Sequence, residues 1–455
     1  DKTLKIASRG KFFDYRIFID KTHNLWLSFA GKTKVWSASD HRWYDSADAF
    51  LVAKGYKLQT KNIVVKCLNN DETGRLWIAT DHDGLLCLDP ISHRSDVYQY
   101  EKGQSTSIPD NTITSFCLDN RGGLWLGSYK NGAAYCSTAD ARFKLIALGD
   151  VCSIVEDQRG NLWCGTNDCG IVAYNPATGS IRSFRSNETG LGNDIVISST
   201  VGKDGALWFG SFNGGLTCYK DGRFKAYRAS ANGKGLVNDN VWVLKTEENG
   251  NIVIATLGGG LQLLNPQTGQ FTTYTTHNSP LVSNFLSSIA FDLTGNILMG
   301  HAQEYSILDA KTHKIRRLIR PKSHKFLSVS SINQIFVDSR GLLWNAGSSG
   351  LSVYDSQSDS LMTIPLFADR KAGTAYAIAE DLSHTLWVTT DQGVSHLVAD
   401  KDEGRWNFFV TNYTDVDGLQ DRQFNSRAIL LCKNGTIVVG GQDGINLLTP
   451  QSESK

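Results

Sequence analysis

The stretch DNRGGLWLGSYKNG, from Asp119 to Gly132, decides the fold because the chain repeats it. Each copy holds an acidic residue, a short polar turn with glycine, a Leu-Trp pair or its equivalent, and a second glycine six or seven residues after the aromatic position. The best further copies are DETGRLWIATDHDG from Asp71, DQRGNLWCGTNDCG from Asp157 and DSRGLLWNAGSSG from Asp338. Self-similarity at a steady spacing indicates a repeat architecture.

The aromatic position of this pattern recurs ten times along the 455 residues. The series is Trp26, Trp77, Trp125, Trp163, Trp208, Val253, Leu298, Trp344, Trp387 and Val438. The spacing between successive members suits four strands of about five or six residues with their turns. We therefore expect ten copies of one small structural unit.

The residues between the turns indicate strands. Apolar and polar residues alternate with a period of two, as in 112–118 and 260–264, and no stretch keeps a helical stripe for long. The acidic residue can accept N–H bonds from the turn, and the glycine can take the positive φ that a tight hairpin needs. His23 and His384 occupy the glycine position in two repeats, where we interpret them as tolerated turn residues.

A lone four-stranded sheet leaves two apolar faces and two edges open, and radial stacking of sheets buries the faces. The sequence thus predicts an all-β protein, a β-propeller built of about ten four-stranded blade repeats. The large residue after the leucine should fill the gap between neighbouring sheets. We therefore expect these tryptophans to pack and not to form a binding surface.

The last repeat, 428–450, reads as three strands without a fourth. One solution is that the strand-like segment 3–8 closes it, giving one continuous ring over 1–455. The preferred solution is that 143–148 closes a C-terminal propeller of seven repeats, with domains at 1–148 and 149–455. The first three repeats would then belong to an incomplete or neighbouring propeller.

The composition excludes several classes of protein. The 46 basic and 45 acidic residues give a net charge of +1, which disfavours a nucleic-acid partner. No apolar run is long enough to span a membrane and no leader pattern is present, so export would require a signal peptide removed beforehand. The nine cysteines, among them Cys87, Cys136 and Cys218, read as small buried thiols, with Cys164 and Cys169 the one pair to test for a disulfide.

Several segments carry a family resemblance. They are GNLWCGT from Gly160, GALWFGSFNGGL from Gly205, the connectors SIPDNTITSF from Ser107 and GLVNDNVWVL from Gly235, and the final blade GLQDRQFNSRAILLCKNGTIVVGGQDGINLLTP from Gly418. With them the chain resembles the two-component regulator propeller family, the periplasmic sensor region of Bacteroidetes hybrid two-component systems. That resemblance implies a periplasmic location, a glycan fragment as ligand, and a membrane histidine kinase beyond this chain's C-terminus. The family usually carries two seven-bladed rings, about four repeats more than this chain has.

Catalytic motifs are missing from the sequence. There is no GxSxG, HExxH, Walker loop or GxGxxG leading from a strand into a helix, so we predict no enzyme activity, no cofactor and no metal site. The hairpin spacing differs from a sialidase Asp box. Streptogramin lyases are closer in blade style, but no histidine is singled out by its spacing as a general base.

Ligand-binding residues are expected on the turns between the second and third strands and on the connectors between blades, because loops on a rigid scaffold read ligands. A separate run, KIRRLIRPKSHK from Lys314, is a candidate anion site, with a soluble outer edge strand as the plainer interpretation. The candidate ligand-binding residues are His82, Tyr129, Lys130, Phe212, Asn213, Trp242, Arg316, Arg317, Arg422, Phe424 and Arg427.

Taken together, these patterns predict a non-catalytic sensor domain that binds an oligosaccharide or other small ligand, alone or as a homodimer. Membrane contact would come only through segments C-terminal to this chain. Two alternatives stay open: a propeller lyase or glycan-degrading enzyme, and a protein-interaction scaffold.

Overall fold

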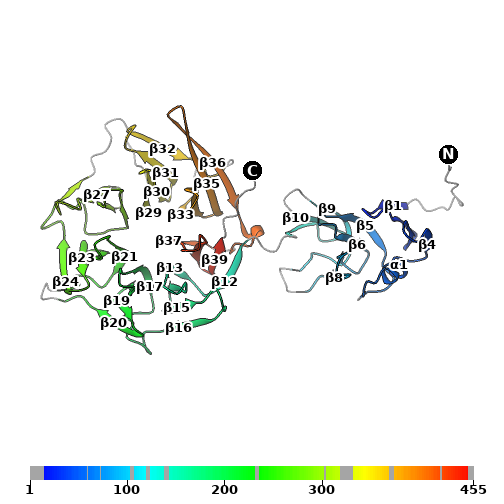
Figure 1. Ribbon diagram of the computed structural model, residues 1–455, viewed down its shortest axis with the longest axis horizontal. Helices are drawn as coiled ribbons and strands as arrows, with labels where there is room; N and C mark the ends of the chain where they lie inside the picture. Colours follow the sequence, from blue (N-terminus) through cyan, green and yellow to red (C-terminus); the bar gives the residue numbers. More distant parts are fainter. Residues whose placement is uncertain are drawn as a thin grey trace. The chain divides into compact units, whose positions relative to one another are not determined.

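The computed structural model describes residues 15–58, 60–71, 73–102, 107–118, 123–137, 143–230, 235–301, 304–317, 331–367, 373–420 and 423–448. The chain forms two compact units, Asp1–Ala141 and Arg142–Lys455 (Figure 1). Both are built from small antiparallel sheets, as the alternating pattern of the repeats predicts.

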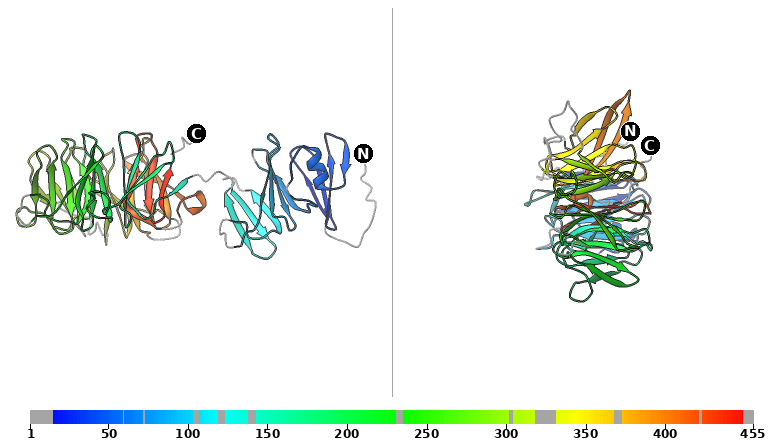
Figure 2. Two further views of the ribbon diagram at one scale, coloured as in Figure 1. Left: turned by 90° about the horizontal axis from the view of Figure 1, so that it is seen from below. Right: turned by 90° about the vertical axis from the view of Figure 1, so that its left-hand side faces the viewer.

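The second unit holds seven four-stranded sheets among its described residues. In Figure 1 they stand around a central axis, with the first strand of each sheet near the axis and the fourth at the rim, and Figure 2 shows the same ring edge-on. Six sheets follow the chain in order: β13 (Val151–Glu156), β14 (Leu162–Thr166), β15 (Ile171–Tyr174), β16 (Ile181–Phe184); β17 (Val196–Val201), β18 (Leu207–Ser211), β19 (Gly215–Lys220), β20 (Arg223–Tyr227); β21 (Val241–Thr246), β22 (Ile252–Thr256), β23 (Leu261–Asn265), β24 (Gln270–Tyr274); β25 (Ser288–Phe291), β26 (Ile297–Gly300), β27 (Tyr305–Leu308), β28 (Ile315–Arg317); β29 (Ile332–Val337), β30 (Leu343–Gly347), β31 (Gly350–Asp355), β32 (Ser360–Ile364); and β33 (Ala375–Glu380), β34 (Leu386–Thr390), β35 (Gly393–Asp402), β36 (Arg405–Tyr413).

The seventh sheet closes the ring with strands from both ends of the unit. Its order is β12-β39-β38-β37, that is Lys144–Ala147, Gly444–Leu448, Ile437–Gly441 and Phe424–Leu431. The register of β12 against β39 runs from Lys144 opposite Leu447 to Ala147 opposite Gly444. The segment 143–148 thus supplies the closing strand and lies in the second unit, which begins at Arg142 and not at 149 as the expected domain bounds had it. The alternative closing segment 3–8 lies outside the described residues. Such closure leaves no open sheet edge between the last repeat and the first.

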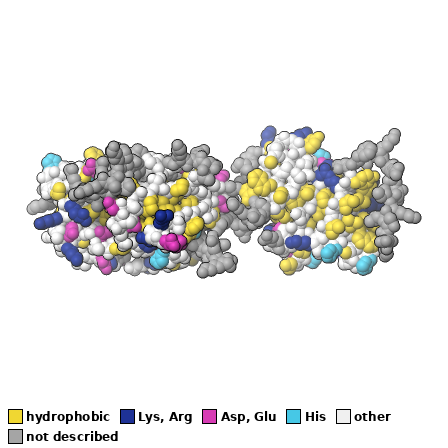
Figure 3. Space-filling view, turned by 90° about the horizontal axis from the view of Figure 1, so that it is seen from above, with side chains coloured by type: hydrophobic (Ala, Val, Ile, Leu, Met, Phe, Trp, Pro, Cys, Tyr) yellow, Lys and Arg dark blue, Asp and Glu magenta, His cyan; other side chains and the backbone are white. Residues whose placement is uncertain are grey.

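The first unit holds three sheets and one helix among its described residues. Its elements are β1 (Tyr15–Ile19), β2 (Leu25–Phe29), β3 (Lys32–Ser37), β4 (Arg42–Tyr44), α1 (Ala47–Ala53), β5 (Val65–Asn70), β6 (Leu76–Thr80), β7 (Leu85–Leu88), β8 (Ser95–Tyr98), β9 (Ile113–Leu118), β10 (Gly123–Ser128) and β11 (Ala133–Ser137). The sheet of β9, β10 and β11 has three strands. Many apolar side chains gather on the face of this unit that Figure 3 shows.

The helix α1 is a feature that the strand pattern did not predict. Ser46 caps it by accepting a bond from the Ala49 N–H, and Phe50 packs edge-on against Trp26 at 5.3 Å between ring centroids. The segment connects two sheets and buries Phe50 and Leu51, so packing stabilises a short helix there.

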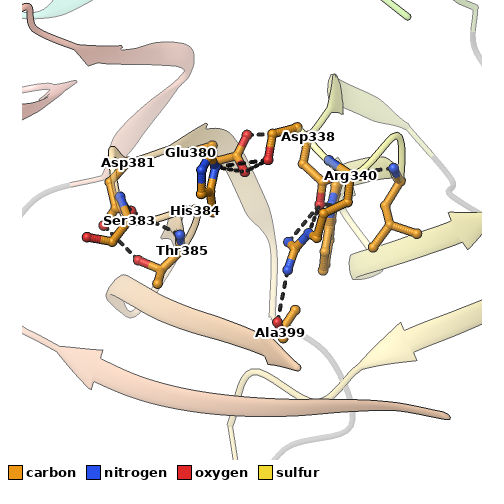
Figure 4. A network of polar contacts seen from close by, with 11 residues as sticks. Asp338, Arg340, Glu380, Asp381, Ser383, His384, Thr385 and Ala399 are labelled. Carbon is orange, nitrogen blue, oxygen red and sulfur yellow. Dashed lines mark hydrogen bonds and ion pairs between the residues drawn. The ribbon is translucent and has the colours of Figure 1, made fainter. Parts of the chain in front are cut away.

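The glycine hairpins form as expected. The hairpin glycines that the structure describes have positive φ, from 79° at Gly205 to 93° at Gly250, and His23 and His384 adopt the same conformation with φ of 64° and 60°. In several hairpins one carboxylate oxygen of the acidic residue accepts backbone N–H bonds. Asp381 Oδ1, for example, accepts from Ser383 and Thr385 (Figure 4). The histidines are therefore turn residues, as interpreted.

The other carboxylate oxygen of the hairpin aspartate has a role that the sequence analysis missed. It accepts the indole N–H of the tryptophan six residues later, at 2.9 Å for Asp338 and Trp344 and 3.0 Å for Asp381 and Trp387. The same bond occurs in the pairs Asp20 and Trp26, Asp71 and Trp77, and Asp157 and Trp163. A buried indole N–H needs an acceptor, so this bond explains why the acid and the tryptophan recur together.

The packing role of the tryptophans is confirmed for all but one. Their exposed fractions are between 0% and 7% at Trp26, Trp77, Trp163, Trp208, Trp344 and Trp387. Trp125 is the exception, because its side chain is 51% exposed and lies 4.9 Å from the Tyr135 ring in the three-stranded sheet. The expectation that every such tryptophan is packed was wrong for this sheet, where the described residues supply no fourth strand.

The cysteines that the structure describes are all free thiols. Cys164 is fully buried on β14 and Cys169 lies on the following turn, so the pair proposed for a disulfide is not joined. Burial raises the pKa of the Cys164 thiol to about 12, and that of Cys87 to about 11. Cys87 is a small buried thiol as expected, Cys218 is half-buried, and the side chain of Cys136 lies outside the described residues.

Candidate functional site

The second unit presents two faces around its axis. The connector face carries the turns between second and third strands, such as 167–170 and 212–214, and the connectors between sheets, such as 185–195 and 228–240. The hairpin face, opposite, carries the glycine hairpins. The sequence analysis placed ligand binding on the connector face.

Backbone hydrogen bonds fix the loops of the connector face to one another. The N–H of Gly170 donates to the Asp194 carbonyl at 2.9 Å, and Gly215 donates to Asp239 in the same way in the next sheet. Gly260 repeats the bond with Asn284. The leucine of each connector is buried beneath its loop, with Leu191, Leu236 and Leu281 between 1% and 4% exposed. This face is therefore a preorganised surface of the kind that binds ligands.

A polar pocket of about 310 Å³ lies on the connector face beside the sheet of β33 to β36. It is formed where the turn after β34 meets the connector that follows β36. Its lining residues are Tyr376, Thr390, Asp391, Gln392, Gly393, Asp415, Gln420, Gln423 and Phe424.

The pocket offers amide and phenol groups at fixed positions. Gln423 Nε2 donates to the Tyr376 hydroxyl at 2.6 Å, and Gln420 Oε1 accepts from the Asp443 N–H at 3.1 Å. Gln420 is 4% exposed and its Nε2 has no hydrogen-bond partner among the described residues. Burial, followed by the charge of Asp391, raises the pKa of Tyr376, which keeps the phenol a neutral donor and acceptor.

The charge of the pocket favours neutral ligands. Among the described residues, Asp391 and Asp415 are its carboxylates, and no lysine, arginine or histidine lines it. These two carboxylates repel an anionic ligand and accept hydrogen bonds from hydroxyl groups, as the amide oxygens also do. The arrangement thus suits a polyhydroxylated ligand.

Two residues of the predicted set meet near the axis. Arg427 Cζ lies 5.1 Å from the centroid of the Trp242 ring, and Arg427 Nη1 donates to the Ser287 carbonyl at 2.8 Å. Trp242 lies in a β-bulge at the start of β21, between Val241 and Val243, which aims its side chain away from the sheet. Arg427 has a φ of 65° within the irregular part of β37.

Other predicted residues of the second unit lie on or beside the connector face. Phe212 is 39% exposed on the turn after β18, and Asn213 beside it donates its N–H to Asn240 Oδ1 at 3.0 Å. Phe424 lines the polar pocket, although its side chain is only 2% exposed. Arg422 lies outside the described residues.

The remaining predicted residues lie elsewhere. His82, Tyr129 and Lys130 belong to the first unit, where His82 Nδ1 contacts Thr112 Oγ1 at 3.1 Å and Lys130 Nζ lies 5.9 Å from the Tyr129 ring. Arg316 is exposed on β28, the outer strand of its sheet, as the plainer interpretation of the basic run expected. Arg317 is the last residue of that strand, and its side chain is outside the described part of the chain. The rest of the basic run, within 318–330, is also outside it.

Sequence reasoning missed four residues of the connector face. Tyr376, Gln420 and Gln423 line the polar pocket, and Phe285 is 63% exposed on a connector. The sequence contained a signal for three of them. Gln420 and Gln423 lie in the segment from Gly418 that carries the family resemblance, and Phe285 follows Asn284 in a connector. Tyr376 gave none, since it occupies an ordinary strand position.

The described residues contain no cluster of three or more metal-ligating side chains. None of the described helices has the length and apolar character that a membrane crossing requires.

Comparison with protein families finds one match. The model described as "Two component regulator propeller" matches residues 107–130 and 146–168. Both segments join a connector to an inner strand and its hairpin or turn. No curated protein matches the sequence.

Comparison with solved structures finds propellers of two kinds. The extracellular domain of a hybrid two component system from B. thetaiotaomicron is 21% identical, with a TM-score of 0.62 over 96% of this chain and 56% of that one. A second such domain from B. thetaiotaomicron, of a one component system, is 18% identical, with a TM-score of 0.57 over 99% and 61%. This chain thus spans 56% and 61% of the length of these two structures.

A catalytically inactive virginiamycin B lyase from Staphylococcus aureus, solved with quinupristin, is 17% identical, with a TM-score of 0.53 over 68% of this chain and 99% of the lyase. At these identities the likenesses establish the fold. The family model matches two stretches of the repeat, so these parts of the chain are similar to the two-component regulator propeller family.

Proposed function

We propose that this chain is the non-catalytic, ligand-sensing part of an exported two-component regulator, that it binds a glycan fragment, and that it signals to a membrane histidine kinase. The family match and the likeness to two extracellular domains of such systems support the sensor role and a periplasmic location. The kinase would lie in a part of the protein beyond this chain.

The observation that carries the proposal is the polar pocket on the connector face. Its amides, phenol and carboxylates match the hydroxyl groups of a sugar. The neighbouring loops are held by backbone bonds, which lowers the ordering cost of binding.

A lyase is the second candidate, because of the structural likeness to virginiamycin B lyase. Elimination requires a general base and a general acid within reach of the reacting atoms. The connector-face pocket is lined by carboxylates and amides, and no histidine lines it. This composition favours binding over proton transfer.

Thermal unfolding in the presence of an oligosaccharide library tests the proposal, with analysis of the sugars afterwards. A sensor is expected to show a raised Tm with one sugar class and no product; a ligand at about 100 times its Kd stabilises by about 2.7 kcal/mol. Product formation would establish an enzyme, and the absence of both a shift and a product would favour a protein-interaction scaffold.

A pair of variants locates the site. Gln423→Ala is expected to weaken sugar binding at least tenfold, because it removes the bond to Tyr376 and a lining amide. Gln442→Ala is the matched control, since Gln442 lies exposed on the neighbouring turn and does not line the pocket. Equal loss in both variants, or in neither, would exclude this pocket.

A further inference from the structure

A second cavity lies on the axis of the second unit, away from the connector-face pocket. It has a volume of about 520 Å³ and is lined by the inner strands, near the ends that lead into the glycine hairpins. Its charged lining residues are Lys245, Arg427, Lys433 and Glu156. The cavity therefore holds an excess of positive charge in a chain whose net charge is +1.

Lys245 is the cation with no counter-charge. It lies on β21 with its side chain exposed to the cavity, and it has no ion-pair partner among the described residues. Desolvation lowers its pKa. Lys245 pairs with Val253 on the neighbouring strand. In two other sheets the residue at the same place is Thr200, which pairs with Trp208, or Phe336, which pairs with Trp344. A lysine here is not needed for packing.

The other charged groups of the cavity are only partly engaged. Arg427 Nη1 donates to the carbonyls of Ser287 and Asn333, at 2.8 and 3.5 Å, and no described carboxylate faces its guanidinium. Burial lowers its pKa to about 10, so it stays charged at neutral pH. Lys433 Nζ donates to the Asp157 carbonyl, and Glu156 Oε2 accepts from the Lys433 N–H.

Hydroxyl groups without partners line the same cavity. Ser153 Oγ and Ser199 Oγ are buried and have no hydrogen-bond partner among the described residues, and Ser153 is 5% exposed. Because these two oxygens have almost no accessible surface, the donors that an anion in the cavity can reach are the exposed Lys245 ammonium and the half-buried Arg427 guanidinium. Oxyanions accept charge-assisted bonds from both kinds of cation.

We propose that the axial cavity binds a small oxyanion of the phosphate, sulfate or carboxylate class, with Lys245 and Arg427 supplying the positive charge. The anion replaces the missing counter-charge at the centre of seven sheets. Because the inner strands of several sheets line the cavity, an anion held there joins them across the axis. This site is separate from the connector-face pocket and does not depend on its ligand.

Calorimetric titration of the whole chain tests the proposal, with sodium phosphate, sodium sulfate and sodium acetate in separate runs and sodium chloride at matched ionic strength as the reference. At least one oxyanion is expected to bind saturably and to raise Tm above the chloride value, and the three runs identify the class. The variant Lys245→Met keeps the chain length of the side chain without its charge. It is expected to bind the same anion at least tenfold more weakly while folding normally.

Lys314→Met is the matched control, since Lys314 is exposed at the rim of the unit and lies outside the cavity. It should bind as the unmodified chain does. Absence of saturable binding to any of the three oxyanions, an equal effect of chloride, or unchanged binding in Lys245→Met would overturn the proposal. Should Lys245→Met fail to fold, Lys245→Gln serves in its place, and the titration of the unmodified chain decides on its own.

Discussion

At the scale of single residues, the structure explains the repeat as a pair of bonds from one carboxylate. The hairpin aspartate accepts turn N–H groups with one oxygen and the indole N–H of the buried tryptophan with the other. The sequence predicted the first bond, because the acid stands beside a glycine turn. The sequence could not predict the bond to the indole N–H, because a spacing of six residues does not say in which direction either side chain points.

Asp338→Ala is expected to destabilise the second unit by about 3 kcal/mol. The change leaves the buried Trp344 indole N–H and the Leu342 N–H without an acceptor and takes the counter-charge from Arg340, which contacts Asp338 at 2.7 Å (Figure 4). Urea unfolding measures the loss. Asp400→Ala on an exposed strand position is the control, and a similar effect of both changes would refute the role of the bond.

The converse change should stabilise the protein. Trp208 Nε1 is buried without a partner, and Gly202 stands six residues before it, where other repeats have the aspartate. A Cβ at Gly202 would lie 3.2 Å from Trp208 Nε1 and 2.8 Å from Asp204 Oδ1, so the Asp204 side chain must be shortened to make room. Gly202→Asp made together with Asp204→Ala is expected to be about 1 kcal/mol more stable than Asp204→Ala alone. No gain in the urea midpoint would contradict this account.

At the scale of the elements, the closing strand decides the ring. Three strands in the last repeat and an apolar segment just before Gly149 were sufficient to predict that 143–148 completes it, because an open edge would otherwise remain. The helix α1 could not be predicted, since its seven residues are too few for a helical stripe to stand out and its stability comes from burying Phe50 and Leu51.

Ile146→Ala in the closing strand is expected to destabilise the second unit by about 3 kcal/mol, because Ile146 is 8% exposed between β39 and its neighbours. Leu145→Ala in the same strand is the control, since Leu145 is 40% exposed, and it should cost less than about 1 kcal/mol. The two urea transitions are compared. If Leu145→Ala costs as much as Ile146→Ala, the strand does not sit in the register described.

The hairpin carboxylates should make stability depend on acid. Burial opposes ionisation of Asp381, but bonds from Thr385, Trp387 and the backbone outweigh it and lower the pKa of this carboxyl. A pKa below the unfolded value of about 3.9 adds stability above that pH, and the stability is lost as the pH falls through the folded pKa. The urea midpoint should therefore drop between pH 5 and pH 2.

Asp381→Asn provides the comparison for this acid dependence. The variant is expected to be less stable at pH 7, because an amide replaces the acceptor of the Trp387 indole bond, and to lose less stability on acidification. An acid dependence equal to that of the unmodified chain would show that the bonded carboxylate is not its source.

At the scale of the whole molecule, the two units contain different numbers of repeats, with three sheets described in the first and seven in the second. Seven sheets close into a ring in the second unit, where the sequence placed it. The predicted ligand-binding residues are divided between the units. His82, Tyr129 and Lys130 belong to the first, and Phe212, Trp242 and Arg427 belong to the second. The positions of the loops in the repeat were sufficient to predict on which face of the ring a ligand is expected. They could not locate a pocket, because the pocket depends on how the turn after β34 meets the connector before β37.

The two candidate sites of the second unit differ in their charge. The connector-face pocket has carboxylates and amides, and the axial cavity has cations without a carboxylate partner among the described residues. A neutral sugar and a small oxyanion should therefore bind independently, and each titration should give the same Kd with the other ligand at saturation. A tenfold change in either Kd would show that the two sites are coupled.

Hydrogen–deuterium exchange with the sugar that raises Tm most tests the central claim, that the connector face of the second unit binds a glycan without chemical change. The account predicts slower exchange of the amides in 390–393 and 418–424, no change in the glycine hairpins at 157–161 and 338–342, and an intact sugar at the end of the experiment. Protection confined to the hairpins, or a cleaved sugar, would contradict it.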